Sequence, residues 1–206
     1  CEWLPKYFNP DVFPQFSAPC RRGLCTSGRL YDARKAAMRL LRKNNFEIEF
    51  FRCEYTSLNE TLAGFEAALV CNLAVDFQPN WKGRLRRLIV RVPKLRLWFH
   101  KHCLAFGATY IPTMGTMWKN FEVAAAGCAP LVDWNEELGE LGFIDGQNAI
   151  IYHDLPELIE KWDHYRDKPD CLKEIGRRAQ ELVRVSHTVD QRVAQLANLI
   201  ERWVRG

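Results

Sequence analysis

The chain has 206 residues, of which 48% are hydrophobic and 26% charged, and its formal net charge is +4. This composition predicts a soluble globular chain, either one large α/β domain or one domain with a helical appendage. No apolar run reaches the roughly 20 residues that a membrane helix needs. The eight cysteines show neither a C-x-x-C pair nor zinc spacing, which favours reduced thiols in a cytoplasmic protein over disulfides or a metal site.

Residues 1–20 contain four prolines and five aromatic residues without any periodicity. Such a stretch is typical of an extended linker that packs its rings against a neighbour. We therefore divide the chain into an interdomain linker or hinge at 1–20 and a domain at 21–206. Because the chain begins with Cys1 rather than Met, and no signal peptide is visible, we expect a fragment or a processed chain.

The next 50 residues alternate between strand-like and helix-like patterns. Strands are expected at 23–27, 47–53 and 67–73, and helices at 29–44 and 56–65. Short β-α-β spacing predicts parallel strands with right-handed crossovers. Gly28 then lies at the carboxyl end of the first strand, where open sheets bind ligands. Arg29 and Arg34 could fork onto a diphosphate there, or they could line a solvated helix face.

Residues 82–106 form a basic insertion, since no acidic residue occurs between Asp76 and Glu122. Apolar and basic residues alternate there with helical spacing, interrupted by Pro93. The segment could contact an anionic membrane surface peripherally, or it could be an insertion that packs on the sheet and solvates its arginines. No nucleic-acid-binding motif is present, so we expect no nucleic acid partner.

The stretch YIPTMGTMWKNFEVAAAGCAP, residues 110–130, reads as strand, loop, helix and strand. The helix would aim its N-terminal N–H groups and positive dipole above the sheet, and Gly115 and Thr116 precede it. Lys119 and Glu122 occupy its first turns. A cation for phosphate and a carboxylate for hydroxyl groups suit a sugar nucleotide. The alternative is a loop followed by an ordinary packed helix.

The last third of the chain is predicted to be mostly helical. A short acidic helix or turn at 135–142, a turn at 145–148 and a strand at 149–152 precede three helices. Asp154 is expected to cap the first of these helices and Thr188 the last. The apolar residues of the last helix are expected to face inward: Val189, Val193, Leu196, Leu199, Ile200 and Trp203. The resulting fold class is α/β, a Rossmann-like open parallel sheet of five or six strands flanked by helices.

Four blocks resemble GT-B glycosyltransferases. GRLYDARK (28–35) is similar to the G-R-L-x-x-x-x-K segment that begins their C-terminal domain, with Arg34 at the lysine position. KNFEVAAAGCAPLVDW, GFIDGQNAIIYHDLPELIEKWDHYRDKPD and HTVDQR resemble three later blocks in the same order. The nearest subgroup is the CgeB/YkvP-like glycosyltransferases. The resemblance covers residues 3–204 except the segment near 77–107.

The resemblance implies one half of a GT-B fold, the half that binds a nucleotide sugar. It assigns the donor diphosphate to Gly28, Arg29, Arg34, Gly115, Thr116 and Lys119. It assigns the ribose to Glu122 and the nucleoside to Glu136. An N-terminal acceptor domain would precede the hinge and would hold the acceptor-activating base, so no catalytic residue is assigned here. No Asp-x-Asp motif is present, and we expect neither a metal nor a cofactor.

One position departs from the family pattern. Many retaining members carry a second glutamate eight residues before the one at Glu122, and this chain has Met114 there. An alternative function is therefore a degenerate, non-catalytic Rossmann-like module that uses its basic segment to contact a membrane surface or a polyanion.

Overall fold

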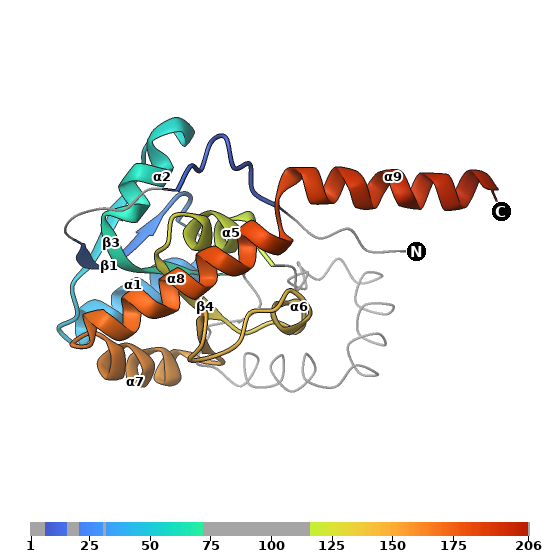
Figure 1. Cartoon of the computed structure of the whole chain (residues 1–206). Coiled ribbons are helices and arrows are strands. Elements are labelled where there is room, and N and C mark those ends of the chain that lie inside the picture. The colour runs from blue at the N-terminus through green and yellow to red at the C-terminus, as the bar shows by residue number, and fades with distance from the viewer. Residues whose placement is uncertain (1–6, 16–20, 31, 72–115, 206) are drawn as a thin grey trace, which may run out of the picture.

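The computed structural model describes residues 7–15, 21–30, 32–71 and 116–205. Elements are numbered as in Figure 1. Within these ranges the structure has five strands: β1 (Arg22–Ser27), β2 (Ile48–Phe51), β3 (Phe65–Val70), β4 (Ala129–Asp133) and β5 (Ile150–Tyr152). The helices are α1 (Asp32–Lys43), α2 (Tyr55–Ala63), α5 (Trp118–Ala125), α6 (Glu136–Glu140), α7 (Leu155–Tyr165), α8 (Pro169–Ser186) and α9 (Val189–Arg205).

The strands form one sheet in the order β2-β1-β3-β4-β5, and every neighbouring pair is parallel. This confirms the predicted Rossmann-like α/β fold. The chain leaves β1 toward β2 on one side and then crosses to β3 on the other side of β1. The strand order therefore reverses at β1, and such a reversal opens a crevice at the carboxyl ends of the strands.

Both faces of the sheet are covered by helices, so the domain has three layers. Each strand sends alternate side chains to opposite faces, as Leu69 and Val70 of β3 do by joining different core clusters. One cluster packs under α2 and α5 and includes Leu62 and Phe121. The other packs under α1 and α7 and includes Leu41.

The long helix α8 crosses the amino end of β4 and joins both core clusters (Figure 1). Its close approach depends on Gly176. A Cβ atom at that position would lie 2.3 Å from the backbone oxygen of Gly127 and 3.2 Å from the backbone nitrogen of Ala129. No side chain fits between this helix and the strand.

The described part of the N-terminal segment packs against the domain. Phe8 and Phe13 are fully buried in the core. The backbone of Phe8 hydrogen-bonds on both sides of Thr188, donating to the His187 oxygen and accepting from the Val189 nitrogen. The chain therefore enters the domain at the junction of α8 and α9.

The capping predictions for the C-terminal helices are confirmed. Asp154 Oδ1 accepts from the Glu157 nitrogen at 3.0 Å and begins α7. Thr188 Oγ1 accepts from the Gln191 nitrogen, while Gln191 Oε1 accepts from the Thr188 nitrogen at 2.8 Å. This reciprocal pair is a capping box and begins α9.

The prediction that the apolar face of α9 points inward is wrong. Val193, Leu196, Ile200 and Trp203 are 60%, 46%, 54% and 88% exposed. The only buried residue of α9 is Arg192. The apolar residues do lie on one side of a helix, but periodicity alone does not say what covers an apolar face. Figure 1 shows α9 extending away from the sheet and its helices.

Several predictions lie outside the described residues. These are the basic insertion at 82–106 with its membrane contact, the strand expected at 108–112, Met114 and Gly115. None of the helices in the described ranges combines the length and the apolar character needed to cross a bilayer.

Candidate functional site

The turn after β1 is the first part of the candidate site. Ser27 ends the strand, and Gly28 follows with φ of +93°, a left-handed conformation that favours glycine. Arg34 is buried, and its Nη1 donates to the Ser27 oxygen and to the Arg29 oxygen, both at 2.7 Å. The guanidinium thus holds the turn by binding two of its carbonyl groups. Arg29 is exposed and precedes α1.

The first turns of α5 supply the second part. Lys119 Nζ lies 2.7 Å from Glu122 Oε2, and both side chains are largely buried. The two residues are three apart and therefore share one helix face. Met117, at the N-cap of α5, makes no side-chain capping hydrogen bond. The predicted cation and carboxylate thus lie together.

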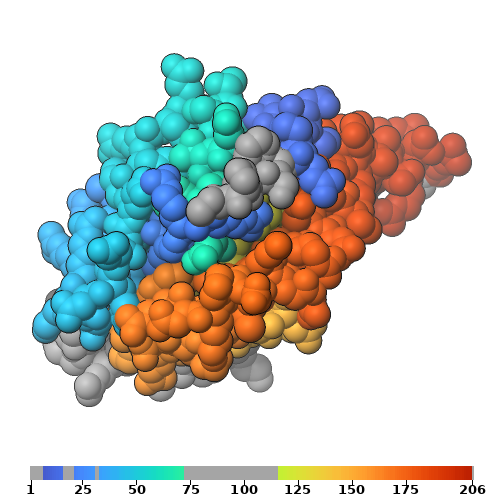
Figure 2. Space-filling view, turned by 60° about the vertical axis from the view of Figure 1, so that its left-hand side comes forward, coloured from blue at the N-terminus to red at the C-terminus, as the bar shows by residue number. Residues whose placement is uncertain are grey.

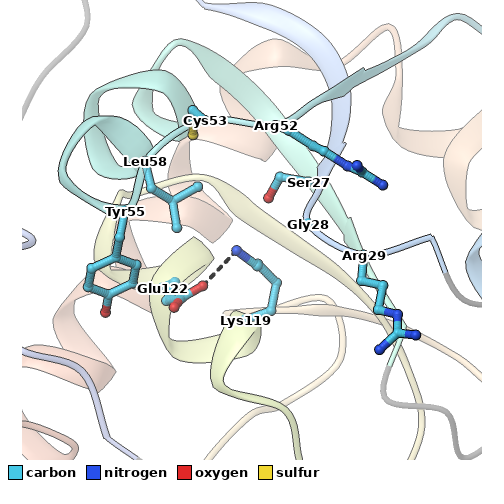
Figure 3. Close-up of a pocket in the computed structure, with 9 residues that line it drawn as sticks. All are labelled: Ser27, Gly28, Arg29, Arg52, Cys53, Tyr55, Leu58, Lys119 and Glu122. Atoms are coloured by element: carbon cyan, nitrogen blue, oxygen red, sulfur yellow. Dashed lines mark ion pairs between the residues drawn. The ribbon is translucent and has the colours of Figure 1, made fainter.

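These two parts meet in one pocket with a volume of about 600 Å³ (Figure 3). Figure 3 shows the Lys119–Glu122 pair on one side and Ser27, Gly28 and Arg29 on the other. The lining residues come from the end of β1, the end of β2, α2 and α5: Ser27, Gly28, Arg29, Arg52, Cys53, Tyr55, Leu58, Lys119 and Glu122. The pocket therefore lies at the carboxyl edge of the sheet, where open parallel sheets bind ligands.

Four of the lining residues were not predicted. Arg52, Cys53, Tyr55 and Leu58 follow β2, and the signal that could have found them is their place just after a strand. Half of the Tyr55 surface is exposed, and its ring packs edge-on against Phe13 at 5.6 Å. Burial raises the pKa of Tyr55, and the negative charge of Glu122 raises it further.

A buried polar atom faces this pocket. Ser27 is 4% exposed and lines the cavity, yet its Oγ has no hydrogen-bond partner within the described residues. Buried hydroxyl groups nearly always have a partner. A ligand with phosphate or hydroxyl oxygens in the pocket would provide one.

Thr116 lies just before α5 and is held by the N-cap and the first turn of α6. Its backbone nitrogen donates to Glu137 Oε2 at 2.6 Å, and its Oγ1 donates to Asn135 Oδ1 at 3.1 Å. Asn135 also caps α6 by accepting from the Leu138 nitrogen. A carboxylate oxygen thus accepts a hydrogen bond from a backbone N–H near the start of a helix, a position that anions favour.

Glu136, the remaining predicted residue, is exposed at the start of α6. It does not belong to the residues that line the pocket. Its predicted contact with the nucleoside stays a prediction.

A buried polar cluster lies where β3, β4 and β5 end. Cys71 Sγ lies 3.7 Å from the Tyr152 hydroxyl. Burial raises the pKa of the Cys71 thiol to about 12, the charge of Asp133 raises it too, and Arg34 acts in the opposite direction. Arg34 and Asp133 thus both lie close to this thiol. A thiol with so high a pKa is not a nucleophile at neutral pH, so the cluster supports the edge of the sheet.

In the described ranges, no group of three or more His, Cys, Asp or Glu side chains is placed to hold a metal ion. The expectation that the chain works without a metal stays a prediction.

Comparison with known proteins identifies a family and a fold. The family described as "Glycosyl transferase-like" matches residues 56–198. No curated protein matches the chain. Among solved structures, a mutant of TarM from S. aureus, in complex with Fondaparinux, alpha-GlcNAc-glycerol and UDP, is similar with a TM-score of 0.53 and 10% identity. Another TarM structure has a TM-score of 0.52 and 8% identity.

Both TarM structures are matched over 96% of this chain and 37% of theirs. The chain therefore spans little more than a third of the solved proteins it resembles. The CgeB/YkvP-like subgroup stays a prediction.

The family match covers more than half of the residues and agrees with the parallel sheet and its flanking helices. The chain belongs to the glycosyl transferase-like family and folds as a Rossmann-like domain of the GT-B type.

Proposed function

We propose that this chain is the donor-binding half of a glycosyltransferase that uses a nucleoside-diphosphate sugar. One observation carries the proposal. A single pocket at the reversal point of the sheet combines a left-handed glycine turn, a buried serine hydroxyl, a lysine and a carboxylate. A diphosphate, a ribose and a base together require such a mixture of groups.

A donor in this pocket would have its diphosphate at the turn after β1 and its base near α2. Its diphosphate would lie against Gly28 and Arg29. Lys119 would supply a positive charge, and Thr116 would supply a backbone N–H group near the start of α5. Glu122 would accept hydrogen bonds from the two ribose hydroxyl groups. The base would extend toward Tyr55 and Leu58. UDP in the TarM complex supports a nucleotide of this class.

Binding would exchange internal partners for donor atoms. The Lys119–Glu122 contact of 2.7 Å pairs both charges within the chain. A ribose on Glu122 would free Lys119 for the phosphate. Arg34, which is buried under the turn, would position Gly28 and Arg29 rather than touch the diphosphate.

The chemistry follows from the leaving group. The bond between the anomeric carbon and the β-phosphate oxygen breaks, and its electron pair stays on that oxygen as the nucleoside diphosphate leaves. The acceptor oxygen forms the new bond to the anomeric carbon and gives its proton to a base outside this chain. Cationic groups aimed at the leaving oxygen stabilise the growing charge most in the transition state.

The acceptor half would precede the hinge at residues 1–20. The TarM structures extend well beyond the region matched by this chain. A preceding domain would face the pocket and supply the acceptor and its base.

A thermal-shift titration with UDP, GDP, ADP and dTDP tests the proposal. A ligand that binds only the folded chain adds about 2.7 kcal/mol of stability at a hundredfold excess over Kd. We expect a rise in Tm with one base above the others. No rise with any of the four would contradict the donor site.

Two variants test whether the ligand binds in this pocket. Lys119→Gln and Glu122→Ala should each weaken binding by roughly tenfold to a hundredfold, because each removes a hydrogen bond to a charged group. Matched controls are Lys173→Gln on α8 and Glu160→Ala on α7, both exposed and outside the pocket. Equal loss in a variant and its control would show a general effect on folding.

A further inference from the structure

Arg52 follows β2 directly and lines the pocket at the carboxyl edge of the sheet. In the parallel register, Ser27 of β1 is the partner of Phe51 of β2. Gly28 and Arg52 therefore leave their strands side by side, at roughly the 4.8 Å that separates neighbouring strands. The backbone alone thus places Arg52 next to the glycine turn.

The Arg52 side chain turns toward the α1 side of the sheet. Its Cζ lies 5.8 Å from the centre of the Phe50 ring, and Phe50 packs against the core cluster under α1 and α7. Arg29, which precedes α1, is exposed, as is Arg52. Figure 3 shows these two guanidinium groups on one side of the pocket and the Lys119–Glu122 pair on the other.

The charges that line the pocket differ between these two sides. Among the described lining residues, Glu122 is the only carboxylate, and Lys119 contacts it at 2.7 Å. Within the described ranges, Arg52 makes neither an ion pair nor a hydrogen bond with another residue. The side of the pocket that holds the two arginines therefore suits a negatively charged part of a ligand.

The second arginine expected to bind a diphosphate, Arg34, has a different role. It is buried, and its Nη1 donates to the carbonyl oxygens of Ser27 and Arg29. It does not belong to the residues that line the pocket. A diphosphate at the glycine turn would therefore meet Arg29 from β1 and, in place of Arg34, Arg52 from β2.

Arg52 lies at the outer rim of the pocket. β2 is the edge strand of the described sheet. In Figure 2 the chain from α1 to α2 lies at one end of the molecule, and α9 projects at the other. With the base near α2 and the ribose on Glu122, the α-phosphate would lie nearest to Lys119. The β-phosphate would extend further, to the turn between the two arginines.

We propose that Arg52 binds the β-phosphate together with Arg29 and makes the pocket select a diphosphate over a monophosphate. The two guanidinium groups hold the phosphate from either side of Gly28 through charge-assisted hydrogen bonds. The β-phosphate carries the oxygen that keeps the electron pair when the sugar leaves, so the same contacts stabilise the leaving group. That the ligand is a nucleotide rests on the proposed function, whereas the binding of a diphosphate does not.

Isothermal titration calorimetry of the 206-residue chain with UDP, GDP, ADP and dTDP, and with the four matching monophosphates, tests this selectivity. Arg52→Gln should weaken binding of the best diphosphate by about tenfold to a hundredfold, because hydrogen bonds between charged groups are lost. Its monophosphate should lose less than about threefold. Lys119→Gln, next to the α-phosphate, should weaken both.

The matched control is Arg39→Gln, which replaces an exposed arginine of α1 outside the pocket and should change neither affinity. A structural role of Arg52 would weaken diphosphate and monophosphate alike. An equal loss of both affinities in Arg52→Gln, or no loss of either, would therefore overturn the proposal.

Inorganic pyrophosphate separates this proposal from the proposed function, because it carries a diphosphate without a base or a sugar. It should raise the Tm of the parent chain and of Arg39→Gln, and raise that of Arg52→Gln less. Arg52→Lys keeps the charge but loses the fork of N–H groups, so its Tm rise should fall between these.

The outcomes of this titration are distinct. A pyrophosphate shift that depends on Arg52, with no shift from any nucleotide, would contradict the proposed function and leave Arg52 as a diphosphate ligand. Equal shifts in the parent chain and Arg52→Gln would overturn the role of Arg52 and leave the donor site standing. No shift with pyrophosphate or with any nucleotide would overturn both.

Discussion

Polar groups near the start of α5 already have partners within the chain. Glu122 holds Lys119, and Glu137 accepts from the Thr116 backbone nitrogen at 2.6 Å. Under the proposed function, the phosphates of a donor would compete with Glu137 for the N–H near the start of α5. Its ribose would compete with Lys119 for Glu122.

This competition predicts a gain of affinity from a single substitution. Glu137→Gln keeps an acceptor for the Thr116 nitrogen but removes a negative charge near the position proposed for the phosphates. We expect UDP, or whichever diphosphate binds, to bind about three to ten times more tightly, roughly 0.6–1.4 kcal/mol. Isothermal titration calorimetry measures this directly.

The matched control is Glu140→Gln at the exposed end of α6, which should change affinity little. Weaker binding by the Glu137 variant would mean that this carboxylate orders the loop for the ligand and does not compete with it.

At the scale of elements, α8 approaches the start of β4 so closely that no side chain fits at Gly176. Gly176→Ala would place a Cβ 2.3 Å from the Gly127 oxygen, and the backbone has to move to relieve it. Overpacking of this kind costs about 1–3 kcal/mol, so urea unfolding should show a clear loss of stability.

Gly139→Ala on α6 is the comparison, because no atom lies within 4 Å of the added Cβ. It should be neutral or slightly stabilising. If both variants were equally stable, α8 would be free to shift away from β4.

The junction of α8 and α9 should respond to pH. His187 lies against the Phe121 ring, with Nε2 2.8 Å from the Leu141 oxygen and Nδ1 in contact with Arg192. Burial lowers the pKa of His187, the Leu141 oxygen raises it, and the charge of Arg192 lowers it. The unfolded state therefore takes up a proton more readily than the folded state, and stability falls as the pH drops below about 6.5.

His187→Gln removes this proton uptake while keeping an amide donor for the Leu141 oxygen. Urea unfolding at pH 7.5 and 5.5 should show a smaller loss of stability in the variant than in the parent chain. The same loss in both would assign the acid sensitivity to other groups.

Sequence patterns predicted local features better than distant contacts. The caps at Asp154 and Thr188 depend on residues a few positions apart, and the structure confirms both. The apolar face of α9 was expected to be buried because its periodicity matches a core helix. Whether such a face packs against the same domain or against another surface depends on the tertiary structure. Local spacing does not determine that.

For the whole molecule, the order of the strands decides which predicted residues meet. Parallel strands and their ligand-binding edge were predictable from the alternation of strands and helices. The contacts of β2 with β1 and of α5 with α2 could not be predicted, since they depend on which strands are neighbours. That is why Lys119 and Glu122 were found from sequence and Arg52, Tyr55 and Leu58 were not.

The central claim is that a nucleoside diphosphate occupies the pocket at the ends of β1 and β2. Cys53 lines this pocket and is exposed, whereas Cys171 is exposed on α8 away from it. Alkylation of both thiols, followed by peptide mass spectrometry with and without saturating nucleotide, reports occupancy at one position with an internal control. We predict that nucleotide slows the alkylation of Cys53 by about fivefold or more and leaves Cys171 unchanged. Unprotected Cys53 in a chain whose Tm rises with the same nucleotide would place the ligand elsewhere and contradict the account.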